Sequence, residues 1–154
     1  MKPSFPYKNS NIASGIKVAT ILFATLVVYH QDLIILGNET IQSELMSHIL
    51  VVPFLLTYLV YRKRKMLRAV IPLKTFLPKR ENVFTNEIVG ALLCLLAFLL
   101  YWYGSYTFQP LEHHMVSLPV FIAGCILVVF NTQTLKVLAF PVAFLLFLTP
   151  PPLE

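Results

Sequence analysis

The sequence predicts an all-α, polytopic membrane protein with about five transmembrane helices, its N-terminus inside the cell and its C-terminus outside. The first observation is composition: 57% of the residues are hydrophobic and only 12% are charged, whereas a soluble chain carries roughly 25% charged residues. The second is charge placement: five crossings put all 12 Lys and Arg residues on one side. Basic loops are retained in the cytoplasm. The opposite side receives Asp32, Glu39, Glu44, Glu112 and Glu154, while Glu81 and Glu87 share the basic side.

The net charge of +5 does not indicate a nucleic-acid partner. The basic residues directly flank apolar segments, as juxtamembrane cations do when they anchor a helix to anionic lipid headgroups. We therefore expect membrane lipid as a partner, no nucleic acid, and a multi-pass location in the cell membrane.

The first predicted helix covers residues 13–36, because a bilayer core needs roughly 20 apolar residues in a helix. Gly37-Asn38 should end it. The second covers 40–61, with Pro53 in its middle, where a proline usually bends a helix. Residues 62–86 then form a basic cytoplasmic loop, whose scattered apolar side chains should rest on the inner headgroups.

The third predicted helix covers residues 87–106, and an outer loop follows as far as His114. The last two apolar runs are 115–130 and 135–150. Each has about 16 residues, or roughly 24 Å of helix, so they could span a thinned bilayer or form a re-entrant hairpin. Spanning is favoured because Lys136 then lies on the basic side. Together, residues 1–154 form one membrane domain.

Ionisable side chains at membrane depth are costly and are often functional. The candidate outer-face site comprises Glu44, His48, His30 and Asp32. Thr40, Glu44 and His48 are spaced four apart, so they should share one helix face. The alternative is that these residues, together with Glu112, His113 and His114, simply mark helix ends and reach water. That interpretation is favoured for His113 and His114 because both fall in the predicted loop, and for His48 the two interpretations stay open. No ligand spacing supports a metal site, and no cofactor is expected.

The two cysteines, Cys94 and Cys125, both fall inside apolar runs with no base or cation nearby in the sequence. Apolar surroundings disfavour the reactive thiolate. We expect both to be inert packing residues.

Three stretches, in this order, resemble the N-terminal portion of the exosortase/archaeosortase family, and its archaeal branch most closely. They are YHQDL at 29–33, SHILVVP at 47–53 leading to YRKRK at 61–65, and FPVAFLLFLTPPP at 140–152. The last stretch is the most specific. The resemblance implies a multi-pass membrane cysteine transpeptidase, whose partner is the C-terminal sorting-signal helix of exported surface proteins. Such enzymes cleave the signal near the outer face and pass the protein to a lipid anchor.

In that family the catalytic Cys, Arg and His follow the Pro-rich stretch, so here they are expected beyond Glu154. No catalytic residue is therefore assigned within the chain. The expectation is a member truncated before its catalytic segment, inactive alone or paired with a separate catalytic half. The alternative is a non-catalytic membrane scaffold or binding subunit for a surface protein or a partner membrane subunit.

Overall fold

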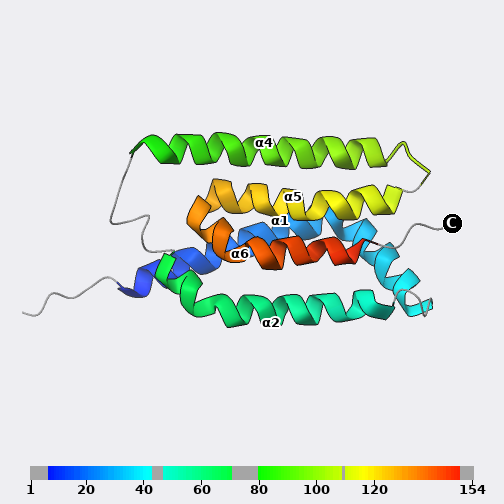
Figure 1. Cartoon of the computed structure of the whole chain (residues 1–154), viewed down its shortest axis with the longest axis horizontal. Helices are drawn as coiled ribbons and strands as arrows, with labels where there is room; N and C mark the ends of the chain where they lie inside the picture. Colours follow the sequence, from blue (N-terminus) through cyan, green and yellow to red (C-terminus); the bar gives the residue numbers. More distant parts are fainter. Residues whose placement is uncertain (1–6, 43–46, 71–79, 109, 150–154) are drawn as a thin grey trace, which may run out of the picture.

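The computed structural model describes residues 7–42, 47–70, 80–108 and 110–149, and these form a bundle of five α-helices (Figure 1). The helices are α1 (Tyr7–Gln42), α2 (Ser47–Val70), α4 (Arg80–Gly104), α5 (Pro110–Val129) and α6 (Thr132–Phe144), and the 3-10 helix η2 (Leu145–Leu148) follows directly. No strand occurs in the described part of the chain. The predicted all-α, five-helix fold is confirmed.

The first helix is longer than predicted. Gly37 and Asn38 do not end it, because α1 continues to Gln42. Gly37 keeps a negative φ, and a single glycine within a helix costs only about 1 kcal/mol. Thr40 therefore belongs to α1, where its hydroxyl donates to the carbonyl of Leu36 at 2.6 Å. The prediction that Thr40 and His48 lie on one continuous helix was wrong.

The predicted cytoplasmic loop at 62–86 is largely helical. α2 carries the basic run as far as Val70, and α4 begins at Arg80; Lys and Arg are good helix formers. The Arg64 guanidinium lies over the Tyr61 ring, 3.9 Å from its centroid. The remaining loop residues, 71–79, lie outside the described residues.

The predicted outer loop up to His114 is also shorter. α5 begins at Pro110, since the fixed φ of proline suits the first position of a helix. His113 and His114 are therefore helical residues. The later turn is capped by Asn131, whose side-chain oxygen accepts from the backbone N–H of Thr134 at 2.8 Å.

Three described segments are long and apolar enough to cross a membrane: Ile12–Gln42, Phe84–Gly104 and Pro110–Val129. The apolar helix Thr132–Leu148 is shorter, as predicted for the last run. Whether it crosses stays a prediction.

α5 is the central helix. It packs against α4, α1, α6 and η2, while α2 lies against α6, η2 and α1 (Figure 1). The contact between α5 and α4 is the closest, because glycines of the two helices face one another there. A Cβ on Gly90 would come within 2.9 Å of the Gly124 carbonyl oxygen, and a Cβ on Gly124 within 2.9 Å of the Cys94 backbone nitrogen. Small residues allow such close approach between membrane helices.

The bundle has two chemically different ends. α1 and α5 run in opposite directions, so the start of α1 lies beside the end of α5 (Figure 1). There Lys17 Nζ donates to the carbonyl of Val129 at 3.3 Å, where a cation suits the helix dipole. The sequence carries no Lys or Arg between Lys17 and Arg62, or between Arg80 and Lys136. The opposite end, where α1 and α4 finish and α5 begins, is therefore free of basic residues.

Candidate functional site

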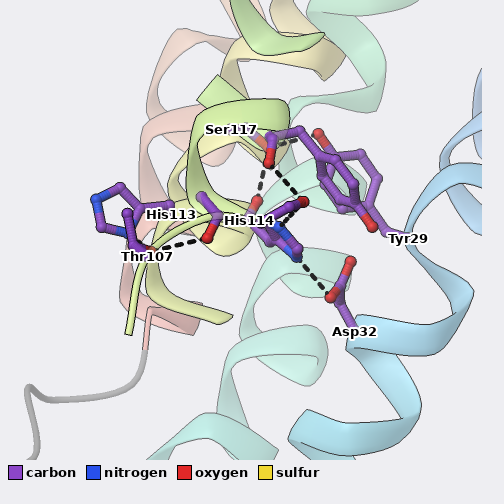
Figure 2. A network of polar contacts seen from close by, with 9 residues as sticks. Tyr29, Asp32, Thr107, His113, His114 and Ser117 are labelled. Carbon is purple, nitrogen blue, oxygen red and sulfur yellow. Dashed lines mark hydrogen bonds and ion pairs between the residues drawn. The ribbon is translucent and has the colours of Figure 1, made fainter. Parts of the chain in front are cut away.

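A buried polar cluster lies at this non-basic end. Its members are Tyr29 and Asp32 from α1, Tyr101 from the end of α4, Ser105 directly after α4, and His114 and Ser117 from α5. We call these six residues the polar cluster. Tyr29 and Asp32 are three apart on α1, as are His114 and Ser117 on α5, so each pair projects from one helix face. Figure 2 shows the two pairs meeting between the helices.

The centre of the cluster is the contact between His114 and Asp32. The Nδ1 atom of His114 lies 2.8 Å from Oδ1 of Asp32, and both side chains are 8% exposed. A buried charge is costly unless it is paired and hydrogen-bonded. This pair joins positions 82 residues apart in the sequence and fixes α1 against α5.

A second chain of hydrogen bonds runs beside this pair. Ser117 Oγ donates to the carbonyl oxygen of His114 at 2.7 Å, and it lies 2.7 Å from the Tyr29 hydroxyl. Because a serine has one hydroxyl hydrogen, Tyr29 must be the donor to Ser117. Tyr29 is 1% exposed and Ser117 is fully buried, so each buried hydroxyl has a partner.

α4 supplies the remaining side of the site. The Tyr101 ring stacks on the His114 ring, with centroids 3.8 Å apart and planes 12° apart, and its edge meets Tyr29 at 5.6 Å. Ser105 Oγ lies 3.2 Å from Nε2 of His114. Gly104 allows the end of α4 to lie this close to the start of α5, because a Cβ on Gly104 would lie 2.6 Å from the Cβ of His113.

One atom of the cluster is not satisfied. Asp32 Oδ2 is buried and has no hydrogen-bond partner of good geometry among the described residues, although the Tyr101 side chain lies close enough to the Asp32 carboxylate to interact with it by charge and by a weaker hydrogen bond. Unsatisfied buried polar atoms are uncommon, and each one in a native structure needs an explanation.

The structure separates the four residues of the predicted outer-face site. Asp32 is buried at the centre of the polar cluster. His30 is exposed, and its Nδ1–H donates to the Val27 carbonyl of its own helix at 3.2 Å. His48 is exposed near the start of α2. Glu44 lies outside the described residues.

His114 was interpreted as a helix-end residue in a loop, and the structure corrects this: it is a buried helical residue paired with Asp32. The adjacent His113 is half-buried, beside Tyr103 and Thr107. Sequence reasoning also missed Tyr29, Tyr101, Ser105 and Ser117. The i, i+3 spacings of Tyr29 with Asp32 and of His114 with Ser117 were the available signal.

The cysteines lie elsewhere along the helices. Cys125 is eight residues from Ser117 on α5, or about 12 Å at 1.5 Å per residue. Cys94 packs at the close contact with Gly124. Among the described residues, no three His, Cys, Asp or Glu side chains gather as metal ligands would.

Comparison with known proteins gives one match. A family model described as transmembrane exosortase (Exosortase_EpsH) matches residues 39–154, which include the α4 and α5 members of the polar cluster but not Tyr29 or Asp32. No curated protein and no solved structure matches the chain.

Proposed function

The chain belongs to the transmembrane exosortase family, and from this we propose that it acts in processing the C-terminal sorting signals of exported surface proteins. In this proposal it is a multi-pass protein of the cell membrane, with its basic end in the cytoplasm. The family resemblance further suggests an archaeal host and transfer of the cleaved protein to a lipid anchor. The sorting-signal helix is the proposed partner.

The observation that carries this proposal is the buried Asp32–His114 pair at the end of the bundle that lacks basic residues. Ionisable residues are rare in membrane helices and tend to mark functional sites. With the basic end in the cytoplasm, the pair lies near the outer boundary, where a sorting signal would be cut. We assign the polar cluster a positioning role: it holds the ends of α1, α4 and α5 in the arrangement that receives the signal.

Neither cysteine of the chain suits a nucleophilic role in this chemistry. Cys94 and Cys125 are partly buried in the contact between α4 and α5, and apolar surroundings leave a thiol unreactive. Cys94→Ala and Cys125→Ala should therefore leave processing unchanged.

The test is processing of a sorting-signal protein in cells that express His114→Gln or Asp32→Asn. Both variants keep the approximate shape of the side chain and remove its ionisable group. We expect the precursor to accumulate in each, with membrane insertion intact by fractionation. His30→Gln is the matched control, because His30 is an exposed histidine on α1 that bonds only to its own helix in the described contacts. Normal processing in both cluster variants would refute the role of the pair.

A non-catalytic binding subunit is the second candidate. It is favoured by the partial burial of both cysteines, which leaves the described chain without an exposed thiol. In that case the chain should co-purify with the surface protein, and deleting it should lower the recovery of that protein without leaving an uncut precursor.

A further inference from the structure

We propose that Ser105, His114 and Asp32 form a relay that makes Ser105 a nucleophile toward carboxylic esters at the membrane boundary. Ser105 Oγ lies 3.2 Å from Nε2 of His114, and Nδ1 of the same ring lies 2.8 Å from Asp32 Oδ1. A nucleophile, a base and a group that orients the base follow one another within hydrogen-bond reach, which is the arrangement that activates a serine. This activity goes beyond the proposed role in sorting.

Hydrogen-bond accounting gives the direction of the relay. An ionised Asp32 can only accept, so Nδ1 of His114 carries the hydrogen in this contact. In a neutral imidazole the other nitrogen, Nε2, is then an acceptor. Its lone pair faces Ser105 Oγ at 3.2 Å. The single hydrogen of that hydroxyl can point either to Nε2 or to the Tyr101 carbonyl oxygen, 3.1 Å away, and proton removal by the general base requires that it point to Nε2.

The base is held firmly while the nucleophile remains accessible. His114 and Asp32 are buried, and the stacked Tyr101 ring covers one face of the imidazole. Ser105 itself is exposed. A substrate can therefore reach the serine without displacing the residues that orient the histidine, as preorganised catalysis requires.

The position of Ser105 indicates the substrate class. The apolar segment of α4 ends at Gly104, so Ser105 lies where a membrane helix meets the headgroup region. A substrate at this depth would be an ester carried by a lipid or by an acylated molecule at the surface.

The reaction balances with the ester and water as the only co-reactants. Ser105 Oγ attacks the carbonyl carbon while its proton moves to Nε2 of His114. The bond from that carbon to the alcohol oxygen breaks, and the alcohol leaves with the proton from Nε2. The products are an acylated Ser105 and a free alcohol. Water then attacks the acyl carbon while His114 removes its proton, the bond to Ser105 Oγ breaks, and Oγ takes that proton as the acid leaves.

A simpler role for Ser105 is to cap α4, because its hydroxyl also lies 3.1 Å from the Tyr101 carbonyl oxygen. Thr20 and Thr57 make the same contact with the carbonyl four residues earlier. Neither has a histidine among its described contacts. The relay is therefore distinguished from a cap by the dependence of its reactivity on His114.

The test uses the full chain in lipid nanodiscs, treated with a fluorophosphonate probe that forms a covalent bond only with activated serines. We expect Ser105 to be labelled, as located by peptide mass spectrometry, and Ser105→Ala to abolish the label. His114→Gln and Asp32→Asn should slow labelling by about 100-fold, the scale of a general base. Absence of label on Ser105, or equal rates in wild type and His114→Gln, would overturn the proposal.

A second pair of variants decides the matter if His114→Gln fails to fold. With His114 and Asp32 unchanged, Ser105→Cys should react with iodoacetamide faster than Tyr106→Cys, which replaces an exposed neighbour. Equal rates would overturn the relay. Failure here is distinguishable from failure of the sorting proposal, because that proposal is scored on precursor cleavage in cells, whereas the relay is scored on labelling of Ser105 in the isolated chain.

Discussion

Asp32 and His114 show what a single buried pair contributes to a membrane bundle. Each alone would place an unpaired polar group between apolar helices, and together they satisfy one another at 2.8 Å. Removing one partner of a buried pair is far more damaging than replacing both, because the remaining group keeps its desolvation penalty. The pair therefore determines how α1 lies against α5.

This predicts the outcome of a double-mutant cycle. Asp32→Asn or His114→Gln should each lower the free energy of unfolding by about 3 kcal/mol or more. The double variant should cost less than the sum of the two, with a coupling of about 1–3 kcal/mol. Unfolding in mixed micelles would be followed by circular dichroism. Exposed His30→Gln should change stability by less than about 0.5 kcal/mol, and strictly additive losses would contradict direct coupling.

Of the two residues in the buried pair, the sequence analysis identified only Asp32 as a site candidate. Asp32 was a candidate because a charge beside an apolar run is expensive. Its partner, His114, was set aside because it fell in the predicted outer loop. The true contact depends on α5 starting at Pro110 and on α1 lying against it, and no local pattern encodes that tertiary placement.

At the scale of elements, the contact between α4 and α5 depends on two glycines. Gly90 and Gly124 let the backbones approach so closely that a Cβ at either would lie under 3.0 Å from backbone atoms of the other helix. A helix–helix contact of this kind tolerates no added methyl, since backbone cannot move aside as a flexible side chain can. By contrast, a Cβ on Gly15 or Gly37 of α1 would meet nothing within 4 Å.

The two sets of glycines should respond oppositely to alanine. Gly124→Ala and Gly90→Ala should each destabilise the bundle by about 1–3 kcal/mol through overpacking. Gly15→Ala and Gly37→Ala should stabilise it by about 0.5–1 kcal/mol, because glycine is entropically costly within a helix. Thermal unfolding in detergent would measure all four. If Gly124→Ala proved as stable as Gly37→Ala, the close packing would be wrong.

The number of helices could be predicted from the sequence, but the residues at which they begin and end could not. Hydropathy identifies five apolar runs because each must bury its backbone hydrogen bonds in a helix. It gives little guidance where polar residues continue the helix, as Arg62 to Arg68 do on α2. Helix-breaking residues can also mislead: Gly37-Asn38 was predicted to end the first helix, but α1 continues through both residues.

For the whole molecule, the charge pattern and the three-dimensional arrangement agree. The basic residues at the start of α1, along the last part of α2 and at the start of α6 gather at one end, because neighbouring helices alternate in direction (Figure 1). The polar cluster occupies the other end. The bundle therefore has one cationic end, which in our proposal faces anionic headgroups, and one end that holds the polar cluster, with Ser105 at its exposed edge.

The orientation of this bundle is the last prediction, and it rests on the resistance of positively charged flanks to translocation. Met66→Cys lies among the basic residues of α2, where the native side chain is 60% exposed. It should be shielded from a membrane-impermeant maleimide in intact cells and react after permeabilisation. Asn38→Cys, exposed near the end of α1, should react in both conditions. Labelling is scored against a background in which Cys94 and Cys125 are alanine. Reaction at position 66 in sealed cells, with protection at position 38, would invert the topology and place the polar cluster in the cytoplasm, where the sorting-signal proposal could not hold.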